Sequence, residues 1–196
     1  MRILGPIVLL QIQRSALKVG QKPNRRYDPA PLLAVDRLEI GPEGAVARPN
    51  GDQVLDVHHQ RHPASRNNDG ENTLSVGFTS HYAAMQRRYG AHMALGCAGE
   101  NIVVQADRPV TPGEVAGGLV ILSAEGTERL RLVRASVAHP CKPFSGFAHR
   151  HELVEPDVLK ETLRFLDGGM RGYYCAPQVT DRVEVCVGDV VAVIRV

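Results

Sequence analysis

The chain of 196 residues has neither a long hydrophobic run nor an excess of charge of one sign. No apolar stretch approaches the ~20 residues that a helix needs to cross a bilayer. Lysine and arginine number 23 against 21 aspartates and glutamates, which leaves a formal net charge of +2. Because nucleic-acid binding normally needs a concentrated basic face, we expect no nucleic-acid partner, and we expect no membrane partner. The composition, 43% hydrophobic and 22% charged, is typical of a soluble globular protein.

The cysteines form no C-x-x-C pair, which argues against a thioredoxin motif and a zinc ribbon. They are Cys97, Cys141, Cys175 and Cys186. The apolar run at the N-terminus is short, is interrupted by Pro6 and is followed by no small-residue cleavage site, so we expect a strand there and not a signal peptide. We therefore expect a cytoplasmic protein whose cysteines are mostly free thiols.

Short runs rich in valine, isoleucine and leucine recur along the chain, separated by glycine, proline, asparagine and aspartate. They cover residues 7–12, 32–40, 74–78, 101–104, 119–123, 130–138 and 190–196. This spacing predicts a mainly β fold, an antiparallel barrel or sandwich with a few peripheral helices. With no internal repeat and no obvious linker, residues 1–196 are expected to form a single domain.

Two helices are expected between the strands. The first is capped by Thr79 or Ser80 and stops at Gly90. The second has Pro156 in its first turn and ends at Gly168-Gly169.

Cys141 is the first candidate for chemistry. It follows the strand-like run 130–137, and prolines on both sides restrict the backbone around it. Lys142 and the nearby His139 favour a thiolate, the form of cysteine that attacks sulfur or binds a soft metal. The alternative is a buried cysteine in a strand-end turn, which is the commoner fate of a free cysteine.

Three further segments carry candidate binding residues. Gly99-Glu100-Asn101 follows a stretch of small residues, so its backbone amides could form an anion-binding nest; the alternative is a tight turn. Arg171 lies between glycines that would let its guanidinium reach a cleft, although a helix end followed by a strand explains the same glycines. The polar segment 50–71 is long for a connection, and its Arg66 suits phosphate recognition or is simply solvated.

The polar segment also holds His58, His59 and His62. Histidines at this spacing could chelate zinc on a helix. No H-E-x-x-H pattern is present, and Pro63 argues against a helix, so we expect loop histidines that face solvent or a ligand.

In this order, Gly99-Glu100-Asn101-Ile102, Pro140-Cys141, Gly172-Tyr173-Tyr174 and Val187-Gly188-Asp189-Val190-Val191 resemble the MOSC family, named for the C-terminal domain of molybdenum cofactor sulfurases. The resemblance implies a β-barrel-like fold with one cysteine in the cofactor cleft, and Cys141 has that position. In the sulfurases and related stand-alone proteins, the domain is associated with binding molybdopterin or carrying sulfur for it. In the amidoxime-reducing relatives, the cysteine ligates molybdenum and the enzymes reduce N-hydroxylated substrates.

The resemblance therefore implies that Cys141 is both the catalytic residue and the molybdenum ligand, and that the molybdenum cofactor is held by a set of polar residues. These are Arg66, Asn67, Gly99, Glu100, Asn101 and Arg171. The family's His-Gly-Gly pattern before the first helix is absent, and Arg66-Asn67 are the candidates to replace its contacts. Because no ferredoxin-type cysteine set is present, reduction of a small-molecule substrate would need an external electron donor.

Two other readings stay open. As a sulfur carrier, the protein would receive sulfur from a donor protein, hold it as a Cys141 persulfide and pass it to a partner's cofactor. As a binding module, it would use no cysteine chemistry at all. Zinc binding through the histidine segment is a minor further alternative.

Overall fold

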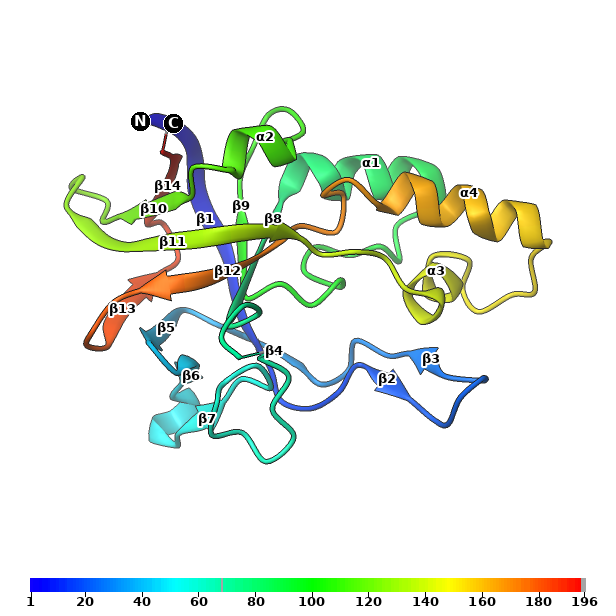
Figure 1. The fold of residues 1–196 in the computed structure, drawn as a ribbon, viewed down its shortest axis with the longest axis horizontal. Coiled ribbons are helices and arrows are strands. Elements are labelled where there is room, and N and C mark those ends of the chain that lie inside the picture. The colour runs from blue at the N-terminus through cyan, green and yellow to red at the C-terminus, as the bar shows by residue number, and fades with distance from the viewer. Residues whose placement is uncertain (68, 195–196) are drawn as a thin grey trace.

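The computed structural model describes residues 1–67 and 69–194. Its main feature is an eight-stranded sheet in which β14 also pairs with β1, so that seven strands close into a barrel in the order β14-β10-β11-β12-β8-β9-β1 (Figure 1). These strands are β1 (Arg2–Gln13), β8 (Leu74–Phe78), β9 (Ile102–Val104), β10 (Leu119–Leu122), β11 (Glu128–Val137), β12 (Tyr173–Gln178) and β14 (Val190–Val193). The predicted mainly β barrel fold is thereby confirmed, with one correction: β8 and β9 pair parallel, while the other strand pairs are antiparallel.

Smaller sheets extend this barrel. β4 (Leu32–Val35) pairs with β1 outside the ring. A second sheet has the order β13-β5-β6-β7 and contains β5 (Arg37–Gly41), β6 (Gly44–Ala47), β7 (Val54–Leu55) and β13 (Val183–Cys186). A hairpin of β2 (Lys18–Val19) and β3 (Arg26–Tyr27) projects from the end of β1. The single run predicted at 32–40 is thus two strands that belong to different sheets.

Helices gather at one end of the molecule (Figure 1). They are α1 (Thr79–Tyr89), α3 (Lys142–Ala148) and α4 (Pro156–Leu166), while the short α2 (Pro112–Val115) and a 3-10 turn (Pro49–Gly51) lie elsewhere. α1 ends at Gly90 as predicted, but Phe78 occupies its N-cap position, because the Thr79 hydroxyl bonds the backbone of Ala106 instead. No helix in the described part of the chain is both long and apolar enough to cross a membrane.

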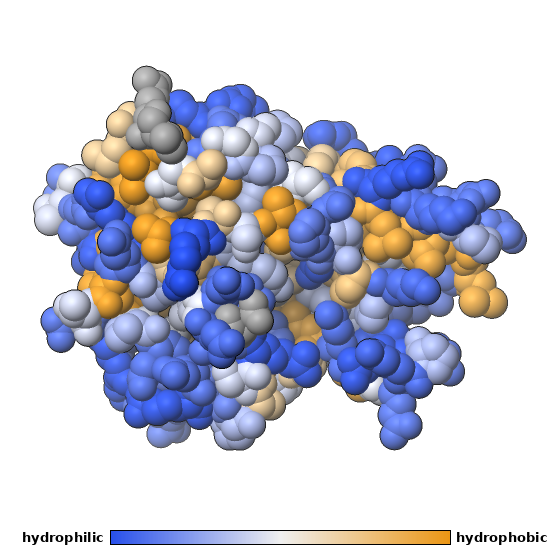
Figure 2. All heavy atoms as spheres, in the orientation of Figure 1, coloured by the Kyte–Doolittle hydropathy of each residue, from blue (hydrophilic) through white to orange (hydrophobic). Residues whose placement is uncertain are grey.

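The protein has two hydrophobic cores. One fills the barrel with alternate side chains of its strands, among them Ile7, Leu74 and Leu132. The other lies between the hairpin and the helices and contains Tyr27, Tyr82 and other side chains. Figure 2 shows a largely hydrophilic face with apolar patches both at the barrel end on the left and at the helical end on the right. The boundary between the two cores is where polar side chains turn inwards.

Candidate functional site

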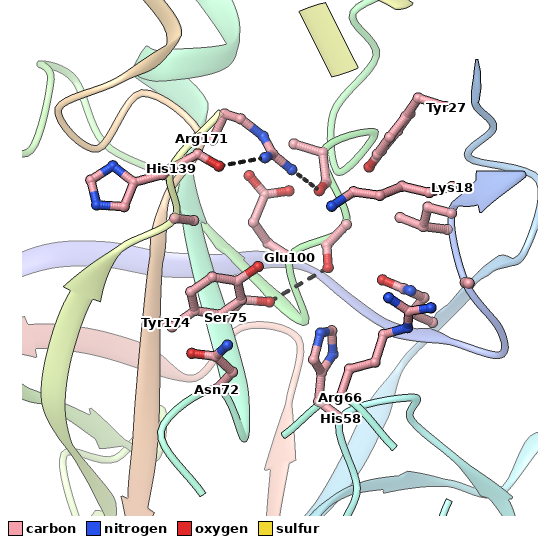
Figure 3. Close-up of a pocket in the computed structure, with 16 residues that line it drawn as sticks. Lys18, Tyr27, His58, Arg66, Asn72, Ser75, Glu100, His139, Arg171 and Tyr174 are labelled. Carbon is pink, nitrogen blue, oxygen red and sulfur yellow. Dashed lines mark hydrogen bonds between the residues drawn. The ribbon is translucent and has the colours of Figure 1, made fainter. Parts of the chain in front are cut away.

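A cavity of about 240 Å³ lies at this boundary (Figure 3). Its walls come from the end of β1, the β2–β3 hairpin, the polar loop 56–72, the turn before β9, and the segments after β11 and before β12. The lining is strongly polar and includes Lys18, His58, Arg66, Glu100 and Arg171. Segments that are far apart in the sequence, including three that carried sequence predictions, therefore meet at one place.

Arg171 reaches the cavity because glycines allow a close turn of the chain before β12. Gly172 has φ +87°, and a Cβ atom there would lie 2.3 Å from the carbonyl oxygen of Val76. The Arg171 guanidinium donates to the carbonyl oxygens of His139 (3.0 Å) and Ala98 (3.2 Å). The alternative explanation of the glycines also holds, because Gly168 and Gly169 follow the end of α4 and Gly172 precedes β12. The close turn at Arg171 is an additional use of them.

The electrostatic surroundings keep Arg171 charged. Burial lowers the pKa of its guanidinium, but Tyr27, Cys141, Tyr174 and Glu100 more than offset this effect, so the pKa lies above its ordinary value. The guanidinium carbon also lies 4.3 Å from the centre of the Phe144 ring, a cation–π contact. Its Nε is buried without a hydrogen-bond partner among the described residues.

Glu100 is a buried carboxyl group beside this cation, with only 2% of the residue exposed. Its Oε2 accepts a short hydrogen bond from the hydroxyl of Tyr82, whereas Oε1 is buried with no partner in the described chain. Burial raises the pKa of Glu100, and this outweighs the lowering by the Tyr82 hydrogen bond and by Arg171. The carboxyl group is thus biased towards keeping its proton.

Two of the predicted binding residues have polar groups that are bonded within the protein. Gly99 lines it with φ +96°, but its N–H donates to the Gly96 carbonyl at 2.9 Å, so this amide is not a free donor for an anion nest. The Asn101 side chain is engaged internally, accepting from Ser75 N–H (3.0 Å) and donating to Asp56 (2.9 Å). It therefore links β8, β9 and the polar loop.

In the polar loop the structure separates the two predicted neighbours. Arg66 lines the cavity with an exposed side chain. Asn67 is not among the described lining residues; its carbonyl oxygen accepts from the N–H groups of Gly70 and Asn72, and Asn72 lines the cavity instead.

The three loop histidines also differ. His59 is almost fully buried, and its Nδ1 accepts from Arg61 N–H at 3.1 Å. His62 bonds to Ala64 N–H and to the Arg14 carbonyl. His58 alone of the three lines the cavity. No group of three or more histidine, cysteine, aspartate or glutamate side chains in the described residues is placed to hold a metal ion.

Cys141 lies next to the cavity but not in its described lining. It occupies the N-cap position of α3 and packs, partly buried, against the core of Tyr27 and Phe144. Cys141 is one of the neighbours that raise the pKa of Arg171, second only to Tyr27. The thiol and the guanidinium are therefore close. The preceding residues Ala138 and His139 do line the cavity.

The other cysteines offer no comparable thiol. Cys97 and Cys175 are buried, and burial raises the pKa of each to about 12. Cys186 lies in the second sheet, and burial together with Glu184 raises the pKa of its thiol. Each is therefore biased against forming a thiolate near neutral pH.

Sequence reasoning missed several lining residues, among them Lys18, Tyr27 and Ser75. Lys18 and Tyr27 belong to two-residue strands, which produce no periodic pattern. Tyr174 belongs to the motif Gly172-Tyr173-Tyr174, and this motif was the one sequence signal that pointed to it as a site residue.

Solved structures with the same architecture were found by comparison. YuaD from Bacillus subtilis matches with a TM-score of 0.58 and 12% identity, covering 97% of this chain and 94% of that one. YiiM from Escherichia coli matches with a TM-score of 0.54 and 13% identity, covering 100% and 71%. YiiM from Geobacillus stearothermophilus gives 0.52 and 13%, covering 99% and 75%. YuaD and YiiM are MOSC-domain proteins.

The chain has a MOSC-type fold. At this level of identity the likeness shows the fold alone. No family model matches the sequence, and no curated protein matches it.

Proposed function

We propose that this protein binds the molybdenum cofactor in the cavity, with the Cys141 thiolate at molybdenum, and reduces N-hydroxylated small molecules. The observation that carries the proposal is the pair of buried groups Arg171 and Glu100, each with one polar atom left without a partner in the described residues. An unpaired buried polar atom costs about 1–3 kcal/mol, and both residues line the cavity, which supports a polar ligand there.

The residues present fit a pterin that carries a phosphate. Lys18 and Arg66 are exposed cations at the cavity, suited to the phosphate, while Glu100 and Arg171 lie inside, suited to the polar edge of the ring. A volume of 240 Å³ is below the roughly 300–1,000 Å³ of ordinary ligand pockets, so a bound pterin would extend past Lys18 and Arg66.

The contributions of the chain itself follow from these positions. Cys141 lies close to the Arg171 guanidinium, and its sulfur is the kind of soft donor that suits molybdenum. The bound cofactor would supply the electron chemistry, with electrons from an external donor protein.

Substitution of the cavity cations tests the proposal. Arg171→Gln should lower the pterin content of protein expressed in cofactor-competent cells by ~10- to 100-fold, because a charge-assisted hydrogen bond contributes about 1.5–3 kcal/mol. Pterin is measured by fluorescence after oxidative release, and circular dichroism checks the fold.

Because Arg171 is buried, the exposed Arg66→Gln provides a second variant, which should also lose pterin. Arg37→Gln, on the second sheet, is the matched control and should retain it. Pterin levels that are the same in all four proteins would contradict binding in this cavity.

A specific observation favours sulfur carriage as the second candidate. Cys141 is partly exposed and lies beside the cavity, outside its described lining. A thiol in this position could hold a persulfide for transfer to a partner's cofactor. This reading predicts molybdenum-free protein that accepts labelled sulfur on Cys141 and loses the label in Cys141→Ser.

A further inference from the structure

The His58 side chain is held by a buried carboxylate. Its Nδ1 lies 2.9 Å from Oδ1 of Asp56, a residue with no exposed surface. His58 is 9% exposed and lines the cavity (Figure 3). An aspartate behind a histidine that faces a cavity is the arrangement by which proteins orient an imidazole for proton transfer.

The hydrogen-bond network assigns the proton on the His58 ring. Asp56 Oδ2 accepts from Gln13 N–H (2.7 Å) and from the Asn101 amide (2.9 Å), and Oδ1 accepts from His58 N–H (2.8 Å). The Asn101 amide must be oriented this way, because its oxygen accepts from Ser75 N–H. Since Asp56 accepts from donors on both oxygens, His58 Nδ1 is a donor too, and Nε2 is the nitrogen left for the cavity.

We propose that His58 is the proton-transfer residue of the cavity and that Asp56 is its positioning residue. This inference rests on the proposed function and adds a group to it. A serine hydrolase triad is not formed, because Ser75 Oγ, which also lines the cavity, bonds Asn101 and not His58.

The proposed reduction consumes protons, and His58 is placed to supply one of them. Cleavage of the N–O bond in R–NH–OH consumes two electrons and two protons and gives R–NH₂ and water. The electron pair comes from the external donor protein. Protonated His58 gives the Nε2 proton to the departing hydroxyl oxygen, remains neutral with Nδ1–H bonded to Asp56, and regains a proton from solvent. The second proton, which goes to nitrogen, comes from water.

Other titratable or charged groups share the cavity with His58. They are Lys18, Tyr27, Arg66, Glu100, His139, Arg171 and Tyr174. Of these, Tyr174 makes a ring contact with His58, with the centroids 6.2 Å apart. His139 forms a similar pair with Asp167 (2.9 Å), but its side chain is 75% exposed and its ring points away from the cavity (Figure 3). Arg171 is bonded to backbone carbonyls, so neither replaces the Asp56–His58 pair.

Nitrogen NMR of the histidine rings tests the arrangement in cofactor-free protein. With the His58 signals assigned from His58→Gln, neutral His58 should be the Nδ1–H tautomer, and Asp56→Asn should shift it towards Nε2–H. An Nε2–H tautomer in the wild type, or a tautomer unaffected by Asp56→Asn, would overturn the assignment.

Turnover of the cofactor-loaded protein tests the role. His58→Gln should lower kcat by ~10²-fold or more while the molybdenum content is unchanged, because general acid catalysis contributes about 10²–10⁴-fold. His62→Gln, which alters a loop histidine bonded within its own segment and to Arg14, should keep the wild-type rate. Full activity of His58→Gln in loaded protein would refute the role of His58 and leave the proposed function intact. Wild-type protein without molybdenum would instead refute the proposed function and, with it, this reaction, whereas the tautomer result would stand.

Discussion

Glu100 and Arg171 are the residues that distinguish this cavity from ordinary packing. Each is buried, each uses only part of its hydrogen-bonding capacity on the protein, and they lie close enough that Arg171 affects the pKa of Glu100. Proteins rarely bury polar or ionisable groups without full pairing. The incomplete pairing is what supports a polar ligand.

The protonation of Glu100 gives a prediction for stability. Burial raises its pKa above the ordinary value of 4.5, so the folded protein retains a proton that the unfolded chain releases. This contribution to stability is fully present below pH 4.5 and is lost as the pH rises through the raised pKa. Glu100→Gln lacks this loss. Urea unfolding should therefore show the wild type losing stability relative to Glu100→Gln between pH 4 and pH 8, and a constant difference would contradict the account.

At the scale of elements, local pattern predicted the long strands and two helices but not the small elements around the cavity. The runs at 74–78 and 119–123 became strands because their apolar residues are buried in the barrel. α3 was missed because Pro143 and Gly146 have low helix propensity, and its formation depends on packing against β3 and α4.

The candidate site was predictable to a similar extent. The order of motifs placed Gly99, Glu100 and Arg171 at one site, and the structure brings them to one cavity. Which of three loop histidines faces that cavity depends on the partners of Asp56 across β1 and β9, and no local pattern encodes these. Residues 195–196 of the last predicted strand lie outside the described residues.

The turn before β12 gives a prediction with a matched control. Gly172 and Gly126 both have φ +87°, but a Cβ atom at Gly172 would lie 2.3 Å from a backbone oxygen, whereas at Gly126 nothing lies within 4 Å. Gly126→Ala should therefore cost only about 1 kcal/mol for the left-handed conformation. Gly172→Ala should cost at least ~2 kcal/mol more, because the backbone that positions Arg171 must move. Unfolding free energies measure both, and equal losses would show that the close approach has no energetic weight.

On the scale of the whole molecule, pairing of β1 with β14 closes the barrel (Figure 1) and sets Arg2 opposite Val193. The cavity lies where the barrel core meets the second core of hairpin and helices: Leu17, Tyr27 and Ala98 belong to the second core and also line the cavity. Cys141 packs against the same core. The thiol and the polar cavity are therefore held by one packed unit.

The central claim is that this unit binds molybdenum through Cys141. The measurement that tests it most directly is the molybdenum-to-protein ratio of wild type, Cys141→Ser and Cys186→Ser, each expressed in cofactor-competent cells. Cys186 is a partly buried cysteine in the second sheet and serves as the matched control. We predict stoichiometric molybdenum in the wild type and in Cys186→Ser, and its loss in Cys141→Ser. Equal molybdenum in all three proteins, or none in any of them, would contradict the claim.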